Sequence, residues 1–444
     1  MSAGRFGRLT DPPATFLLVG GRVIDPSGGT DAIRDLAVHV GTIVADAPDD
    51  TERIDAHGLV VAPGFCDLHA HLREPGGDGS ETTESGSRAA ARGGFTTVCA
   101  MPNTDPPLDD PAAVAAVARR SPACRIRVIG AATRGRAGET VGDLAAMAGA
   151  GAVGFSDDGA AVPSADLTRD ILSALATLGL PLVEHAEDAG LAGEAVMRAG
   201  AVATRLGLAG WPPEAELAIV ERDIALAAEA GARLHLTHLS TAGAVDAVRA
   251  AKTRGELVTC DVTPHHFALT DAWVAGSRRF SWEEAEPAAA RAYDGRCRVN
   301  PPLAPAEDAL ALLAGLVDGT IDAIATDHAP HPTDRKLVPF VAAAPGLIGL
   351  ETALSLGLAA VEAGRLGLAT LVAALSTRPA AIIGEGRSLE IGDPADLTVF
   401  DPAARWRVEA SQLASSSANT PLIGLELPGI VRLTVAEGRV TYRS

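Results

Sequence analysis

The sequence predicts an α/β fold, a (β/α)8 TIM barrel that carries a small β-sandwich domain built from both termini. Three observations lead to this prediction. Short β-prone runs occupy both ends of the chain, the middle alternates β-prone runs with Ala-rich helical stretches, and acidic or histidine side chains follow several of the middle runs. Strands that alternate with helices favour a parallel sheet, and eight such units, spread here over about 320 residues, close into a barrel.

Both ends of the chain carry β-prone runs separated by Gly and Asp turns. They lie at 16–19, 36–40 and 42–44 in the first segment and at 397–400, 430–435 and 438–442 in the last. We therefore expect residues 1–62 and 384–444 to build one small β-sandwich together, with a barrel of residues 63–383 inserted between them.

The middle of the chain supplies the strands and helices of the barrel. Its expected strands are 59–68, 96–101, 126–132, 152–155, 180–184, 234–237, 257–262 and 321–326. Ala-rich stretches between them predict helices at 111–120, 167–178, 214–230 and 242–252. The stretch 269–300 fits neither pattern and is interpreted as an irregular insertion after the seventh strand.

Composition limits the class of protein. The chain is 47% hydrophobic and 21% charged, as in ordinary globular proteins, and its net charge of -19 argues against nucleic acid or an anionic membrane as a partner. The first eight residues lack the apolar core of a signal peptide, and the apolar stretch 337–350 is short and interrupted by two prolines. We expect a cytoplasmic protein, whose five scattered cysteines are reduced core thiols.

The segment from Asp67 to Arg73 carries the strongest chemical signal. His69 and His71 lie two residues apart at the end of an apolar run, so on a strand both imidazoles face one side and can hold one metal ion. Four other potential ligands also sit at or just after apolar runs: Asp158, His185, His238 and Asp327. Because active sites of (β/α)8 barrels lie at the carboxyl ends of the strands, these residues predict a metal site at the barrel mouth.

Several ordered motifs together resemble the amidohydrolase superfamily and, more closely, its class I dihydroorotases. They are the segments 64–76, 94–98, 101–104, 155–159, 184–185, 237–241, 263–266, 300–303 and 326–331. The resemblance covers nearly the whole chain. Two features depart from the family pattern: Ala304 stands where many relatives have an arginine, and the 269–300 insertion is long.

The resemblance implies one or two zinc ions per subunit. It assigns His69, His71 and Asp327 to one metal and His185 and His238 to a second, with a carboxylate bridging both. Many relatives bridge with a carboxylated lysine, but the only lysines here, Lys252 and Lys336, lie far from the fourth strand in the sequence. The resemblance points instead to Asp158 as the bridge, with the neighbouring Asp157 as the alternative.

The implied reaction is the reversible cyclisation of N-carbamoyl-L-aspartate to L-dihydroorotate in de novo pyrimidine (UMP) biosynthesis. Zinc lowers the pKa of a bound water to roughly 7, and Asp327 would carry the proton between that water and the ring nitrogen. Arg73, two residues beyond His71, is a natural bidentate partner for the substrate carboxylate. The resemblance adds Asn103 and His331 as carboxylate contacts, Asn300 as a ring contact, and the backbone of Pro345 and Gly346 as a cover over the ring.

Other histidines receive weaker interpretations. We expect His39 and His57 at the surface or in turns, His235 as a packed structural residue, and His328 as a support for Asp327. His265 and His266 follow the seventh strand, where one of them could approach the site.

Two other functions stay open at this point. Another cyclic amidase, such as a hydantoinase or allantoinase, is disfavoured by the missing lysine bridge and by the carboxylate contacts. A non-catalytic scaffold of aspartate transcarbamoylase is disfavoured because such homologues lose metal ligands, and none is lost here. The resemblance also favours a homodimer and allows aspartate transcarbamoylase as a partner of an active enzyme.

Overall fold

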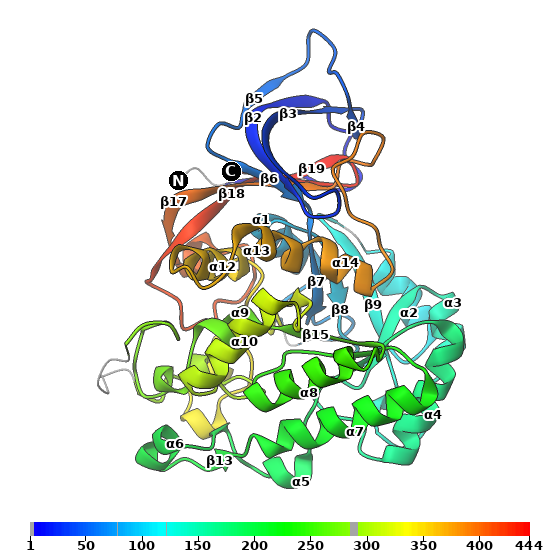
Figure 1. Cartoon of the computed structure of the whole chain (residues 1–444), viewed down its shortest axis with the longest axis vertical. Coiled ribbons are helices and arrows are strands. Elements are labelled where there is room, and N and C mark those ends of the chain that lie inside the picture. Colours follow the sequence, from blue (N-terminus) through cyan, green and yellow to red (C-terminus); the bar gives the residue numbers. More distant parts are fainter. Residues whose placement is uncertain (1–3, 78, 121, 285–291) are drawn as a thin grey trace.

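The computed structural model describes residues 4–77, 79–120, 122–284 and 292–444. Strands from the two ends of the chain lie side by side at one end of the molecule, and the barrel with its helices forms the larger part below them (Figure 1). The first and last described strands, β1 (Arg5–Phe6) and β19 (Arg439–Arg443), pair with one another. This arrangement confirms the predicted fold class.

The terminal strands form one hydrogen-bonded sheet. Its order is β1 (Arg5–Phe6), β19 (Arg439–Arg443), β18 (Glu426–Ala436), β17 (Leu397–Arg407), β6 (Val60–Pro63), β2 (Phe16–Asp25), β3 (Thr30–His39) and β4 (Thr42–Val44), and β5 (Arg53–Asp55) pairs with β2. Segments from the two ends of the chain meet where β6 runs antiparallel to β17, with Val61 opposite Val399, and again where β1 pairs with β19. Alternate apolar residues of these strands enclose a small core of their own, which includes Leu18, Val38 and Val435.

The barrel consists of parallel strands in sequence order. These are β7 (Phe65–Ala70), β8 (Phe95–Ala100), β9 (Arg125–Ala131), β10 (Ala152–Ser156), β11 (Leu182–Glu184), β14 (Leu234–Leu236), β15 (Val258–Val262) and β16 (Ala323–Ile324). The first and last strands approach one another beyond the end of β16, because the His71 amide donates to the His328 carbonyl at 2.9 Å. The Asp67 side chain also accepts from the Thr326 amide at 2.8 Å. The barrel strands lie at the positions that the sequence predicts, with one exception.

The exception is the stretch 59–68, which was expected to be a single strand. The structure divides it at Gly64 into β6 of the terminal sheet and β7 of the barrel. The Gly64 amide donates to the Asp396 carbonyl at 2.8 Å, and a β-carbon at this position would lie 2.3 Å from Thr96 Oγ1. The chain turns here between two sheets in a space that only glycine fits, and the continuous apolar pattern conceals this turn.

Helices surround the barrel strands (Figure 1). The longer ones are α1 (Thr83–Gly93), α2 (Pro111–Ala118), α4 (Ala165–Leu178), α7 (Glu214–Ala230), α8 (Ala242–Thr253), α10 (Ala306–Asp318), α12 (Ala353–Glu362) and α13 (Leu368–Leu375). Shorter ones are α3 (Leu144–Gly149), α5 (Ala189–Ala192), α6 (Ala201–Leu206), α9 (Pro264–Ala268), α11 (Thr333–Lys336) and α14 (Thr377–Ile382). The predicted helices correspond to α2, α4, α7 and α8.

Two smaller features lie outside this scheme. A short parallel pair joins β12 (Met197–Arg198) to β13 (Gly210–Trp211). Within the 269–300 insertion, the described residues form 3₁₀ turns at Asp271–Trp273 and Gly295–Cys297, and residues 285–291 lie outside the description. All five cysteines are buried and free. Among the described residues, no helix is both long enough and apolar enough to cross a membrane.

Candidate active site

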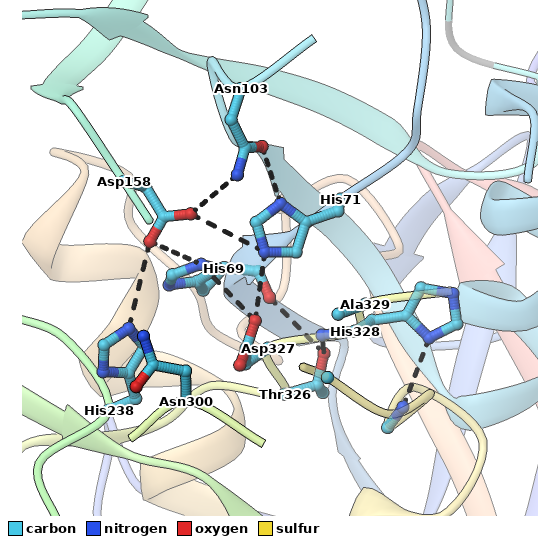
Figure 2. A network of polar contacts seen from close by, with 12 residues as sticks. His69, His71, Asn103, Asp158, His238, Asn300, Thr326, Asp327, His328 and Ala329 are labelled. Carbon is cyan, nitrogen blue, oxygen red and sulfur yellow. Dashed lines mark hydrogen bonds and ion pairs between the residues drawn. The ribbon is translucent and has the colours of Figure 1, made fainter. Parts of the chain in front are cut away.

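Six acidic and histidine side chains meet at the carboxyl ends of the barrel strands. His69 lies in β7, and the others follow a strand end: His71 after β7, Asp158 after β10, His185 after β11, His238 after β14 and Asp327 after β16. All six are buried. The strand ends therefore bring together all six residues that the sequence predicts as metal ligands, although they span more than half the chain. Figure 2 shows five of them, His69, His71, Asp158, His238 and Asp327.

The Asp158 carboxylate lies at the centre of this group. Its Oδ1 is 3.3 Å from His69 Nε2, 3.7 Å from His185 Nδ1 and 3.9 Å from His238 Nε2. Its Oδ2 is 3.7 Å from His71 Nε2. One carboxylate thus faces both pairs of histidines, which is the position that a bridging ligand requires.

The neighbouring aspartate faces elsewhere. Asp157 accepts a hydrogen bond from the Thr133 amide at 3.0 Å and a second from the Thr133 hydroxyl. Neither lysine is a bridge candidate, because Lys252 pairs with Asp322 and the Lys336 ammonium donates to backbone carbonyls, including that of Gly346 at 2.8 Å. These contacts favour Asp158 over the alternatives.

Asp327 lies beside the histidine pair at the end of β7. Its Oδ1 lies 3.1 Å from His71 Nε2 and 3.6 Å from His69 Nε2. On the other side of Asp158, His185 Nδ1 and His238 Nε2 are only 3.0 Å apart. The donor atoms therefore form two sets that share Asp158, one with His69 and His71 and one with His185 and His238.

The donor atoms fit a divalent metal ion. His69 Nε2 is buried and has no hydrogen-bond partner among the described residues, which is costly unless an ion accepts its lone pair. The opposite ring nitrogens are held by neighbours: His69 Nδ1 lies 2.8 Å from Thr237 Oγ1, and His71 Nδ1 lies 2.8 Å from Asn103 Oδ1. Such contacts fix the orientation of a ligating imidazole, and buried imidazoles with carboxylates are a ligand set that zinc accepts.

Electrostatics in the cluster also favour a bound cation. Burial opposes ionisation of Asp158, but His69, His185 and His238 hold its pKa well below the usual value. Burial alone would lower the pKa of His69 and His185. Asp158, with Asp327, instead raises the pKa of His69 to about 9, and Asp158 with Glu187 raises that of His185 to about 10. The cluster therefore favours positive charge beside its carboxylates, which a divalent ion would supply.

The backbone around the site contains unusual conformations. Three non-glycine residues near the site have a positive φ: Arg73 at 58°, His238 at 41° and Asp327 at 44°. Asp261 accepts from the His238 amide at 2.7 Å, and Asp67 accepts from the Thr326 amide at 2.8 Å. Buried carboxylates thus hold the strained turns that aim His238 and Asp327 at the cluster.

The predicted carboxylate contacts lie beside the metal ligands. The Arg73 Nε donates to the Pro330 carbonyl at 3.2 Å, and its Nη2 lies 3.5 Å from His331 Nε2. His331 Nε2 lies 2.7 Å from the Pro345 carbonyl, which brings the turn at Pro345 and Gly346 next to the histidine. Because β7 ends at Ala70, strand alternation does not set the direction of Arg73; the following loop does.

The two asparagines of the predicted site contact the metal-ligand cluster itself. Asn103 Nδ2 donates to Asp158 Oδ2 at 3.0 Å, while its Oδ1 faces His71. Asn300 Nδ2 donates to Glu187 Oε2 at 2.7 Å, and the same oxygen lies 3.0 Å from His185 Nε2. Glu187 was not identified from the sequence. Its position two residues after His185 was the available signal, because a carboxylate near a ligand histidine commonly orients the ring.

The remaining histidines take structural positions. His235 is packed between Thr259 and Asp261, as expected. His328 was expected to support Asp327, but its ring points away from the cluster, where Nε2 lies 3.1 Å from Glu81 and Nδ1 accepts from the Gly349 amide (Figure 2). His266 contacts Thr263 and Pro301, and burial lowers the pKa of His265 to about 4.

Comparison with known proteins finds dihydroorotases both by family model and among the curated relatives. The family model described as Dihydro-orotase-like matches residues 58–244. The dihydroorotase of Geobacter sp. (strain M21) is 44% identical over 97% of this chain and 99% of the relative. The dihydroorotase of Anaeromyxobacter dehalogenans (strain 2CP-C) is 45% identical over 96% of this chain and 98% of the relative.

Two solved structures with a similar fold are named as a hydantoinase and a dihydropyrimidinase. The L-hydantoinase (dihydropyrimidinase) from Arthrobacter aurescens superposes with a TM-score of 0.81 at 26% identity, covering 98% of this chain and 96% of the other. The dihydropyrimidinase from Brevibacillus agri NCHU1002 superposes with a TM-score of 0.79 at 21% identity, covering 97% and 95%. At that identity the second likeness supports the fold alone.

Proposed function

Because this chain belongs to the dihydroorotase-like family, we propose that it is a class I dihydroorotase, a hydrolase that interconverts L-dihydroorotate and N-carbamoyl-L-aspartate in pyrimidine biosynthesis. The observation that carries the proposal is the Asp158 carboxylate between the two histidine pairs, with Arg73 and His331 next to them. A metal centre next to a cationic side chain suits a cyclic amide that also bears a free carboxylate.

We propose one or two zinc ions as the cofactor. His69, His71 and Asp327 would hold one ion, His185 and His238 the other, and Asp158 would join them. When bound, zinc would polarise the amide carbonyl and make a water more acidic. The chain supplies the imidazoles and carboxylates that fix the ions.

The side chains divide the remaining tasks. Arg73 and His331 would hold the substrate carboxylate, Asn103 would add a contact there, and Asn300 with the backbone of Pro345 and Gly346 would enclose the ring. During ring opening, Asp327 would accept the proton of the attacking water and deliver it to the leaving ring nitrogen. In cyclisation, the same carboxylate would accept the proton of the ureido nitrogen as that nitrogen attacks the carboxyl carbon. It would then deliver this proton to the carboxyl oxygen, whose bond to carbon breaks and which leaves as hydroxide.

The decisive experiment assays the purified protein with its metal content quantified in the same sample. We expect interconversion of L-dihydroorotate and N-carbamoyl-L-aspartate, and little turnover of dihydrouracil, hydantoin or allantoin. In Asp327→Asn, the rate should fall by about 10²-fold or more through loss of the proton carrier. Metal-loaded wild type that prefers hydantoin or dihydrouracil would support the alternative cyclic amidase, which the hydantoinase-like neighbour favours. Near-normal turnover by Asp327→Asn would contradict its role.

We further propose a cytoplasmic homodimer that aspartate transcarbamoylase can join. The curated relatives support the enzymatic activity and not the partner. Aspartate transcarbamoylase would supply the carbamoyl aspartate that this reaction consumes. Sedimentation of the protein alone and mixed with aspartate transcarbamoylase tests both states, and a monomer that forms no complex would contradict them.

A further inference from the structure

The turn at Pro345 and Gly346 is built to pack closely against the loop after β16. Gly346 has a φ of 119°, and a β-carbon there would lie 2.5 Å from the Ala329 side chain and 3.3 Å from His331 Nε2. The Gly346 amide donates to the Arg298 carbonyl at 2.9 Å. The turn therefore lies between the loop that carries His331 and the segment that leads to Asn300.

Lys336 donates hydrogen bonds to the backbone of this turn. Lys336 is the last residue of α11 and is only 2% exposed. Its ammonium donates to the carbonyls of Ala344 at 2.6 Å, Gly346 at 2.8 Å and Arg298 at 3.1 Å. All three donor positions of the ammonium are thus directed at backbone around the turn, an arrangement that a surface lysine would not need.

Asn419, near the C-terminal end of the chain, also forms hydrogen bonds with this turn and with the loop after β16. Asn419 belongs to the segment between β17 and β18, and it is buried. Its Nδ2 donates to the Ala329 carbonyl at 2.9 Å and the Gly346 carbonyl at 3.3 Å, while its Oδ1 accepts from the His331 amide at 3.1 Å. A single amide group therefore joins the His331 loop to the turn.

We propose that Asn419 and Lys336 are positioning residues that hold His331 and the turn at Pro345 and Gly346 in the arrangement that receives the substrate. The inference rests on the proposed function, because it takes these segments as the carboxylate and ring contacts. Every atom that the two side chains bind belongs to those segments or to Arg298, two residues before Asn300. Loops that are already held in place lose less conformational entropy when substrate binds. Substitution of Asn419 or Lys336 should therefore mainly weaken substrate affinity.

The test compares Asn419→Asp with wild type in the metal-loaded enzyme. Aspartate keeps the acceptor for the His331 amide but replaces the Nδ2 donor with an oxygen that faces two carbonyls. We expect the KM for L-dihydroorotate to rise about tenfold, while kcat changes by less than about threefold and the zinc content stays unchanged. The matched control is Ser416→Ala, an exposed residue of the same segment, which should leave KM unchanged.

A double-mutant cycle with Arg73→Ala separates positioning from general stability. If Asn419 acts through the carboxylate pocket, Asn419→Asp should raise KM much less in the Arg73→Ala background than in wild type. Equal effects in both backgrounds, or a loss confined to kcat, would overturn the proposal. Should Asn419→Asp fail to fold, Lys336→Gln is judged by the same KM criterion, with Lys252→Gln as the charge-matched control.

The outcome also separates this inference from the proposed function. A wild-type enzyme that turns over L-dihydroorotate, with an unchanged KM in a folded Asn419→Asp or Lys336→Gln variant, would remove the positioning role and leave the function intact. Wild-type protein that carries metal but has no turnover of L-dihydroorotate would overturn both.

Discussion

Arg73 is the residue on which recognition of the substrate carboxylate depends most directly. Its positive φ and its contact with the Pro330 carbonyl direct the guanidinium toward His331 instead of solvent. We expect Arg73→Ala to raise the KM for L-dihydroorotate by about 10- to 100-fold, because a charge-assisted contact is lost, with bound zinc unchanged. Arg88→Ala, an exposed helix position, serves as the control. Wild-type affinity in Arg73→Ala would exclude Arg73 from the substrate site.

We expect the buried His265 to make the folded protein less stable in acid. Burial lowers the pKa of His265 to about 4, and the unfolded chain has the ordinary value of about 6.5. The unfolded state therefore binds more protons between these values, so the free energy of unfolding falls as the pH drops from about 6.5 toward 4. The contribution reaches about 3 kcal/mol at the acid end.

His265→Gln tests this dependence in metal-free protein. We expect urea unfolding of the variant to lose less stability between pH 7.5 and pH 5 than wild type does. The exposed His57→Gln variant should follow wild type. A variant with the same loss as wild type would show that His265 does not contribute.

At the scale of single residues, the sequence identified side chains that follow strand ends and missed those whose role depends on loop geometry. The six candidate ligands could be predicted because each lies in a strand or shortly after its end, although turns with positive φ set the direction of His238 and Asp327. Glu187 was missed, and the expected contact between His328 and Asp327 was wrong, because loop turns decide both side-chain directions. Assignment of catalytic and binding roles to these residues stays a prediction until the variants are measured.

Among the elements, α1 depends on close packing at its last turn. Gly93 ends this helix, and a β-carbon there would lie 2.1 Å from the Leu350 carbonyl oxygen. Because the obstacle is backbone, Gly93→Ala should destabilise the protein by about 2 kcal/mol or more in urea unfolding. Gly149 ends α3 with open space around it, so Gly149→Ala should be neutral or stabilise by up to about 1 kcal/mol. Equal effects of the two substitutions would contradict this account.

Strands and helices with a clear period were predictable, and the junctions between sheets were not. The apolar runs at 126–132 and 257–262 correspond to β9 and β15, and the helix at 214–230 has the predicted bounds. The division at Gly64 was missed because β6 and β7 are both fully buried and share one apolar run. The alternation of residues cannot indicate that a strand changes sheets where the chain bends.

For the whole molecule, the pairing of both termini in one sheet was predictable because both ends carry short β-prone runs around a helical middle. The order of the strands was not, since β6 joins β17 across more than three hundred residues of sequence and nothing local encodes that partner. The exact boundaries at 62/63 and 383/384 stay predictions. The C-terminal segment contributes Asn419 to the candidate site, so the terminal part of the chain and the barrel depend on one another.

Metal removal should weaken the entire barrel, because the candidate ligands come from strands around it. Metal held by His69 and Asp327 would join β7 to the end of β16, and metal held by His185 and His238 would join β11 to β14, in the folded state only. Zinc at about 100 times its Kd would then add about 2.7 kcal/mol to the free energy of unfolding. We expect chelation to lower Tm by at least about 3 °C and zinc to restore it.

Paired variants at the two adjacent aspartates make this test specific. Asp158→Asn should lose the zinc-dependent rise in Tm, because the central carboxylate no longer faces both histidine pairs as an anion. Asp157→Asn should start from a lower Tm, since the Asp157 carboxylate accepts two hydrogen bonds from Thr133, but it should keep the full rise on adding zinc. Loss of the rise in Asp157→Asn with retention in Asp158→Asn would reverse the assignment of the bridge. No rise in wild type would contradict a metal centre that joins the strands.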